Sequence, residues 1–442
     1  MPTLYLFLIF ALVLAGLIVL TTRFRFPIFL VMLFATFAFG LLAGLDPVVV
    51  VSKSLEGFKQ MMGGLAVLIV SGFLLGELLE KSGGTVAIAN ATLRLLGKKR
   101  APWAMALTGA VISVPVMCCD TAFIILSPIS RALARGGRLP LALISLALAT
   151  GTYSAFKLIP PAPGPLGVMS FFGANFAKTF FLSLLVFCPV FLVGMFWSLK
   201  AGKAVQDQFP AEEGALFQEE NELKPKTTVW MALLPIISPL FLIIIHSFAP
   251  SIFPDTPILQ SWALFLGNPA VALPLGVVMQ MALNRKSGMD NLNQWFSQAV
   301  NRAASILLIV GAGGALGAVV QETGLANTLG EFLIKSRIPG LLVPFLLAAL
   351  FKITQGSSLV AMLTTPALIA PFLPALHLSP EIAALAVGAG ALAVVHINDS
   401  FFWVVTRFAE MDVRRGFRTL TLLSLWQSLV ALSVVWILGF FF

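Results

Sequence analysis

Apolar residues fill most of the chain in long runs, which short polar or basic loops separate. An α-helix needs roughly 20 apolar residues to cross the hydrocarbon core of a bilayer, and these runs are long enough to do so. The pattern therefore predicts an all-α polytopic membrane protein. Ten spanning segments are expected, near residues 3–20, 27–45, 62–79, 139–170, 178–199, 229–247, 258–283, 302–320, 380–405 and 417–441.

Polar or turn-forming residues interrupt four of the apolar stretches. Residues 101–133 and 339–374 each have a polar break in the middle, and we expect each to form a re-entrant hairpin. Residues 139–170 and 380–405 are expected to be broken helices. Paired interruptions of this kind in the two halves of a hydrophobic chain indicate a substrate site near the midplane of a secondary transporter.

The two halves of the chain resemble each other in the order and spacing of these features. Each half is expected to hold five spans and one hairpin, and because five is odd, the second half must be inverted in the membrane. We expect a first inverted repeat at 1–199, a cytoplasmic linker at 200–228 and a second repeat at 229–442. The matching pairs lie 237 to 241 residues apart and include Gly72 with Gly313, Pro128 with Pro366, Gly151 with Gly388, and Pro161 with Asn398.

Composition and charge agree with a membrane protein. The 442 residues are 59% hydrophobic and 11% charged, whereas a soluble domain has about 25% charged residues. With the N-terminus outside, 21 of the 28 Lys and Arg residues fall in predicted cytoplasmic loops, as the positive-inside rule requires. The net charge of +9 therefore indicates topology and not nucleic-acid binding, and the expected location is a bacterial inner membrane with both termini periplasmic.

The three cysteines do not indicate a metal site or a disulfide framework. Cys118, Cys119 and Cys188 all lie in apolar stretches and lack metal-ligand spacing. No cofactor is expected. The glycine-rich run Gly311–Gly317 does not match the G-x-G-x-x-G pattern of a nucleotide loop. We interpret it as a set of small residues that lets helices pack closely in lipid.

The two helix breaks are candidate anion sites. Pro160–Pro165 holds four prolines and one glycine, Gly164, and cannot continue a helix. The second break contains Asn398, Asp399 and Ser400. Half-helices are expected to begin after the breaks, near Leu166 and Phe401. Helix starts offer free N–H groups and positive dipoles, which suit an anion.

The hairpin tips and the lysines supply further candidates. Asp120 matches Ser358 in the repeat, and an intramembrane carboxylate is costly unless it is paired or protonated. Lys157 is interpreted as a counter-ion of Asp120, as an anchor for a substrate carboxylate or as a snorkelling lysine, and Lys352 shares this ambiguity. The hydroxyl groups at the second tip either cap helices or contact substrate. The candidate substrate-binding residues are Asp120, Thr121, Lys157, Pro161, Gly164, Gly356, Ser357, Ser358, Asn398, Asp399 and Ser400, and the candidates for the coupling proton are Asp120, His396 and Asp399.

Several motifs in this order resemble the gluconate permease (GntP-type) family of the ion transporter superfamily. The resemblance covers nearly the whole chain. It is carried by Pro160–Pro165 in the first half, and by Gly311–Gly317, Gln355–Met362 and His396–Trp403 in the second. It implies a scaffold domain, a mobile transport domain with elevator-type movement, a homodimer, and uptake of a small sugar or hydroxy acid coupled to protons.

One position departs from the family pattern. The family usually has a histidine four residues before the paired prolines, and this chain has Phe156 there, with Lys157 next to it. A lysine adds positive charge, which would favour a smaller or more anionic acid than gluconate. The alternatives are a transporter of D-serine, a sodium-coupled dicarboxylate transporter, a channel, and an intramembrane hydrolase that uses Ser357 and His396. We expect a transporter and not an enzyme.

Overall fold

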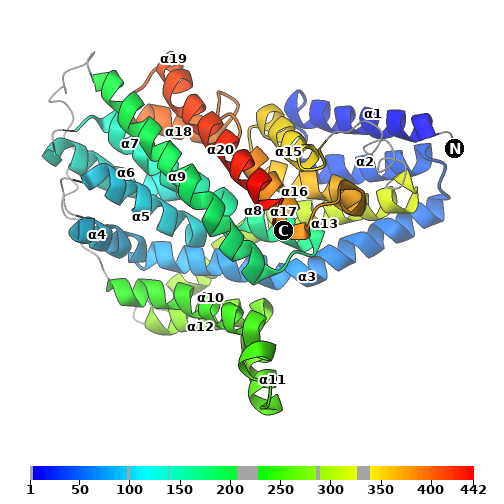
Figure 1. Cartoon of the computed structure of the whole chain (residues 1–442), viewed down its shortest axis with the longest axis horizontal. Coiled ribbons are helices and arrows are strands. Elements are labelled where there is room, and N and C mark those ends of the chain that lie inside the picture. The colour runs from blue at the N-terminus through cyan, green and yellow to red at the C-terminus, as the bar shows by residue number, and fades with distance from the viewer. Residues whose placement is uncertain (1–2, 97–99, 138, 207–226, 285–288, 326–338) are drawn as a thin grey trace.

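The computed structural model describes residues 3–96, 100–137, 139–206, 227–284, 289–325 and 339–442, and these residues contain helices and no strands (Figure 1). The helices are α1 Thr3–Thr22, α2 Ile28–Leu42, α3 Pro47–Lys81, α4 Gly84–Leu96, α5 Ala101–Val116, α6 Cys119–Gly137, α7 Leu141–Leu158, α8 Pro163–Phe172, α9 Phe176–Gln206, α10 Val229–Ile252, α11 Pro257–Leu266, α12 Pro269–Leu283, α13 Met289–Glu322, α15 Leu342–Gln355, α16 Ser358–Ile369, α17 Pro380–Ala391, α18 Ser400–Phe408, α19 Val413–Gly416 and α20 Leu422–Leu438, with a 3-10 turn η3 at Ala370–Leu376 and a π-helical turn η4 at Phe417–Thr421.

Fewer helices reach membrane-spanning length than the ten predicted segments. Among the described residues, six helices are long and apolar enough to cross a bilayer, or up to eight if two bent pairs each count as one span. One bent pair lies in α3, and the other is α11 with α12, which meet at 65°. The predicted single span at 258–283 is therefore two helices. Asn268 explains the second start, because its Oδ1 accepts the Ala270 N–H at 3.0 Å and Pro269 follows it.

The chain also differs from expectation before the first hairpin, in the linker and in the second hairpin. α4 is a helix that the hydrophobic pattern did not predict. α9 continues to Gln206, so the linker expected at 200–228 begins with helix, and its residues 207–226 lie outside the described residues. Residues 358–376 are long and apolar enough to cross a membrane, although we expected them to be one arm of a hairpin.

The two longest helices, α3 and α13, lie side by side across the molecule (Figure 1). Their backbones touch where glycines face each other: a Cβ atom on Gly57 would lie 2.2 Å from Gly314 O, and a Cβ on Gly314 would lie 2.4 Å from Gly57 O. Gly317 packs against Ala367 in α16 in the same way. The glycine-rich run thus packs helices, as predicted.

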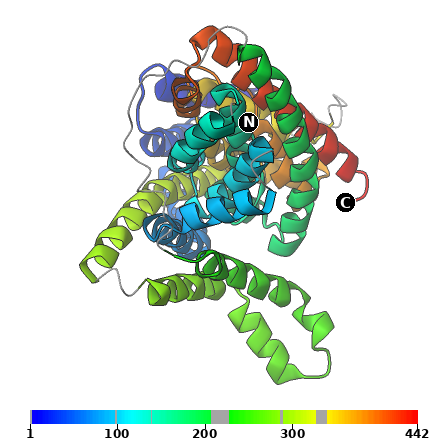
Figure 2. The same cartoon turned by 90° about the vertical axis from the view of Figure 1, so that its left-hand side faces the viewer.

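The interrupted helices lie at the centre of the molecule. In an 18-residue apolar stretch of Leu141–Phe172, the segment that contains α7 and α8, 94% of the stretch is buried, the largest share among the six membrane-length segments of the described residues. One hydrophobic core joins α5, α6, α7 and α9 to α17, α18 and α20, and a second joins α1, α2 and α8 to α13, α15, α16 and α17. α10 and α12 pack against α4 and α3 at one side of this body, and α11 projects away from it (Figure 2). The broken helices therefore lie where the two cores meet.

Candidate functional site

Four backbone interruptions surround the centre of the fold. α5 ends at Met117, which has φ +58, and α15 ends at Gly356, which has φ +70. The other two interruptions separate α7 from α8 and α17 from α18. α18 contacts α6 and α7, and α8 contacts α16 and α17. The packing therefore brings the breaks of the two halves of the chain together.

An ion pair joins α15 to the second break. The Lys352 ammonium group contacts the Asp399 carboxylate, and both side chains are buried. Lys352 Nζ also donates to Gly356 O at 3.5 Å. The second Asp399 oxygen accepts the Phe401 N–H at 3.0 Å and so caps α18. Asp399 is thus held by a cation and by a helix start, and Lys352 is its counter-ion.

The loop before α18 also binds the tip of α15 directly. A Cβ atom on Gly356 would lie 2.0 Å from Asn398 O, so only glycine fits there. Asn398 Nδ2 donates to Thr354 O at 2.7 Å. His396 Nε2 lies 2.9 Å from Ile353 O. These contacts place Gly356, Asn398 and His396 in one cluster, as a site formed by the second tip and the second break requires.

The first hairpin tip meets the same half-helix from the other side. Ser400 Oγ donates to Asp120 Oδ2 at 2.5 Å. Asp120 lies in the first turn of α6, and Ser400 is the first residue of α18. No lysine, arginine or histidine nitrogen in the described part of the chain lies within 4.0 Å of the Asp120 carboxylate. Asp120 is therefore a half-buried carboxylate that accepts hydrogen bonds and has no ion-pair partner there.

Lys157 is a buried cation without a carboxylate partner. The residue is 1% exposed, so its side chain does not snorkel to a membrane surface. Its ammonium group donates to Tyr153 O at 3.3 Å and to Cys119 Sγ at 3.8 Å. Across the described ranges, no Asp or Glu oxygen lies within 4.0 Å of it. A direct ion pair with Asp120, one of the three interpretations, is thus absent from this structure.

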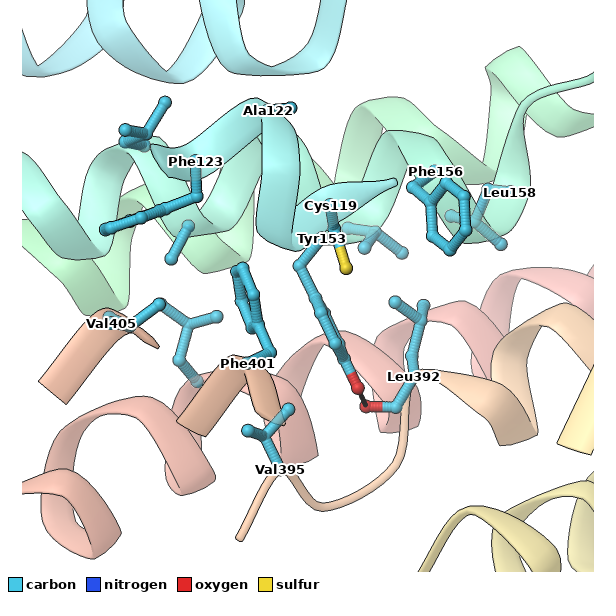
Figure 3. Close-up of a cluster of buried hydrophobic side chains, with 14 of the residues drawn as sticks. Cys119, Ala122, Phe123, Tyr153, Phe156, Leu158, Leu392, Val395, Phe401 and Val405 are labelled. Atoms are coloured by element: carbon cyan, nitrogen blue, oxygen red, sulfur yellow. Dashed lines mark hydrogen bonds between the residues drawn. The ribbon is translucent and has the colours of Figure 1, made fainter. Parts of the chain in front are cut away.

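Two residues that sequence reasoning missed surround Lys157. Cys119 Sγ contacts both charges, because it also donates to Asp120 Oδ1 at 3.4 Å. The Tyr153 ring lies under the Lys157 ammonium, 3.1 Å from nitrogen to ring centroid. Figure 3 shows the Tyr153 ring running from α7 toward Leu392, with the Cys119 side chain beside it. The missed signal was spacing, since Tyr153 precedes Lys157 by one helical turn.

The half-helices begin slightly earlier than predicted and differ as anion sites. α8 begins at Pro163 and not near Leu166, and α18 begins at Ser400. The Asp399 carboxylate already accepts one N–H of the first turn of α18, that of Phe401. In α8, Pro163 and Pro165 have no N–H group. The Leu166 N–H donates to Ala162 O at 3.0 Å. Gly164 is therefore the one residue before Leu166 in this first turn that offers a free N–H group. Neither helix start is a broad open anion site.

The remaining predicted residues line the same region. Pro161 and Ser358 are buried, and Thr121 is half-buried beside Asp120. Ser357 Oγ accepts the Val360 N–H at 3.4 Å and caps α16. The Ser357 hydroxyl is hydrogen-bonded to α16 and the His396 ring to α15. The two side chains are therefore not arranged as the nucleophile and base of a hydrolase. No group of three metal-ligating side chains occurs among the residues described.

The space beside Lys157 is closed in this conformation, whereas Asn398 and Ser400 are exposed. The cavity beside Lys157 has a volume of about 10 Å³ and is lined by residues of α7, α8, α9, α16 and α17. That volume is close to the space of one water molecule. Gly164 packs against Met362, and Gly388 against Lys157 O, so the helices approach closely around it. A ligand of several carbon atoms needs these helices to separate.

Known proteins share both the sequence and the fold of this chain. A gluconate permease of Pseudomonas aeruginosa is 30% identical over 96% of this chain and 95% of its own length. A high-affinity gluconate transporter of Escherichia coli is 27% identical over 92% of this chain and 93% of its own length, and the E. coli D-serine transporter DsdX is 28% identical over 96% of each.

A solved transporter has the same overall fold. The crystal structure of the Alcanivorax borkumensis YdaH transporter superposes on this chain with a TM-score of 0.66 and 15% sequence identity. The match covers 94% of this chain and 98% of the YdaH chain.

The family model of the GntP family permeases matches residues 4–441. The chain is thus a multi-pass membrane transporter and not an enzyme. With nearly every residue matched by that model, the chain belongs to the GntP permease family.

Proposed function

We propose that this permease imports a small organic acid, such as gluconate, together with protons. The observation that supports this most is the buried Lys157 ammonium without a carboxylate partner in the described residues. Burying an uncompensated ion costs several kcal/mol. The carboxylate of a bound acid would supply the missing negative charge, so the substrate anion would bind beside Lys157, between α7 and the first hairpin tip.

The charges around Lys157 rank the substrate classes. Lys352 already has Asp399 as its partner, so in the described part of the chain a dicarboxylate would find one free buried cation and not two. A D-amino acid is the second candidate, because the Asp120 carboxylate lacks a cation in the described region and could accept an ammonium group. The family contains relatives named for gluconate and for D-serine, and both molecules carry the carboxylate that Lys157 would bind.

Proton coupling is assigned to the carboxylates of the site. Asp120 remains the first choice. Among the described residues, its oxygens accept hydrogen bonds from Ser400 and Cys119 alone, and a proton would remove a charge that has no ion-pair partner there. Asp399 is the second choice, because protonation would have to break its pair with Lys352. His396 is the third, since its nitrogens lie beside Ile353 O and the Asn398 N–H.

The proposed architecture is two inverted repeats, at 1–199 and 229–442, that work by elevator-type alternating access. The support for it is a sequence of elements that occurs twice. Two helices joined by a hairpin tip are followed by a broken helix, first in α5 to α8 and again in α15 to α18. The proposed orientation has both termini in the periplasm of the inner membrane, and the proposed assembly is a homodimer. The packed pair α3 and α13 would belong to the static part.

Purified protein in proteoliposomes tests this function. An acidic exterior should drive accumulation of labelled gluconate inside vesicles, and a proton uncoupler should abolish it. If a sodium gradient drives uptake and a pH gradient does not, proton coupling is wrong. Accumulation of labelled D-serine by vesicles that do not accumulate gluconate would favour the amino-acid alternative. Counterflow, in which internal unlabelled substrate accelerates uptake, separates a carrier from a channel.

A further inference from the structure

One buried tyrosine touches both the unpaired cation and the opposite half of the fold. Tyr153 is 1% exposed and lies in α7, one turn before Lys157. Its ring stacks on Phe401 of α18, with 5.3 Å between ring centroids and an interplanar angle of 17°. The single hydrogen of its hydroxyl is shared by two carbonyl oxygens at the end of α17, Leu392 O at a distance of 3.3 Å (Figure 3) and Ala391 O at 3.5 Å.

The ring and the backbone of Tyr153 hold the Lys157 ammonium in place. The nitrogen lies 3.1 Å from the ring centroid and 3.3 Å from Tyr153 O. A desolvated cation over an aromatic face is attracted by the negative face of the ring. The ring offers no negative charge that would compete with a substrate carboxylate. The ring therefore holds the ammonium group in position without neutralising its charge, which can still pair with a substrate carboxylate.

The hydroxyl acts at a different place. Ala391 is the last residue of α17 and Leu392 is its C-cap, where main-chain carbonyls have no partner within the helix. In a buried region such carbonyls need another donor, and Tyr153 supplies it. Movement of the second break away from α7 must therefore break this bond, and closure must remake it.

We infer that Tyr153 is a positioning residue of the transport site, whose ring orients Lys157 for the substrate carboxylate and whose hydroxyl fastens the second break in the closed state. This inference rests on the proposed function. Loaded and empty carriers both pass through a closed state during alternating access. Loss of the hydroxyl should therefore slow turnover, and loss of the ring should weaken binding.

Two substitutions separate these roles. Tyr153→Phe keeps the ring, and we expect the Kd for gluconate to stay within about threefold while turnover in proteoliposomes falls at least about fivefold, the effect of one unsatisfied buried acceptor. Tyr153→Leu removes the ring as well, and we expect the Kd to rise at least about fivefold. The matched control is Tyr5→Phe, which removes an exposed hydroxyl that donates to Leu42 O at 3.3 Å on α2. The sequence has two tyrosines, so this pair is complete.

The readouts are the Kd from calorimetry on purified protein, and KM and kcat from uptake. A kcat-selective loss in Tyr153→Phe that Tyr5→Phe does not show supports the inference. Equal loss of binding and turnover in Tyr153→Phe, or behaviour identical to Tyr5→Phe, overturns it, and this variant decides the matter even if Tyr153→Leu does not fold. If wild-type protein neither binds nor transports an organic acid or a D-amino acid, the proposed function fails first. If it does and the variants show no split, only the role of Tyr153 fails.

Discussion

The Lys352 ammonium and the Asp399 carboxylate form a buried ion pair that joins α15 to the start of α18. Removing one member leaves the other buried and uncompensated, at a cost of about 3–5 kcal/mol. We expect Lys352→Met and Asp399→Asn each to lower the thermal unfolding temperature in detergent markedly. The double variant should recover much of that loss, because no lone charge remains.

The double variant is the informative measurement for this pair. A strong positive coupling in the thermodynamic cycle identifies the pair as a unit. Unfolding temperatures that fall additively in the double variant would show that each side chain stabilises the fold through other neighbours, such as Gly356 O for Lys352 or the Phe401 N–H for Asp399.

Substrate affinity should depend on the charge of Lys157. We expect Lys157→Met to raise the Kd for gluconate by about tenfold or more, since a hydrogen bond to a charged group contributes about 1.5–3 kcal/mol. The same variant should unfold at the wild-type temperature or higher, because it removes an unpaired buried charge. Lys59→Met, at an exposed position of α3, is the control. Unchanged affinity in calorimetry with Lys157→Met would place the carboxylate elsewhere.

Asp120 should govern the pH dependence of uptake. Asp120→Asn keeps the size of the side chain and can still accept the Ser400 hydroxyl, but it cannot take up or release a proton. We expect the variant to exchange substrate in counterflow and to lose accumulation driven by a pH gradient. Asp255→Asn, in the exposed loop between α10 and α11, should behave as wild type. Full pH-driven accumulation in Asp120→Asn would transfer coupling to Asp399 or His396.

The second tip should tolerate no side chain at Gly356. Gly356→Ala places a methyl group 2.0 Å from Asn398 O at φ +70, so the loop and the tip must separate. Gly324→Ala is a matched control, because Gly324 has the same φ of +70 and no atom within 4 Å of its Cβ position. Both variants carry the left-handed strain of about 1 kcal/mol. The additional loss of unfolding temperature in Gly356→Ala measures the contact, and equal losses would show that the tip is not tightly packed against the loop.

The positions of the helix breaks follow from local chemistry, and for this reason the sequence reveals them. Prolines without N–H groups end α7 near Pro160–Pro165, and Gly356 adopts a positive φ that other residues avoid. The family resemblance is carried by the same segments and is confirmed across the chain. The early starts of α8 and α18 are differences of one to three residues, because proline and aspartate both favour the first positions of a helix.

Pairing across the fold could not be predicted in this way. Lys352 and Asp399 are 47 residues apart and Asp120 and Ser400 are 280 apart, and nothing in one sequence links such positions. Tyr153 was missed because an aromatic residue in an apolar helix usually indicates packing alone. α4 was missed because it is shorter than a span, and the bend between α11 and α12 was missed although Gly267-Asn268-Pro269 marks it.

The backbone contact between Gly57 and Gly314 has a consequence for biogenesis. The two glycines are 257 residues apart in the chain, and at about 5–20 residues per second the ribosome needs roughly 10–50 s to make that length. During this time α3 has entered the membrane without the helix that will cover its glycine face. The insertion machinery or lipid must cover the glycine face of α3 first. Assembly of the transporter then ends when α13 displaces that cover.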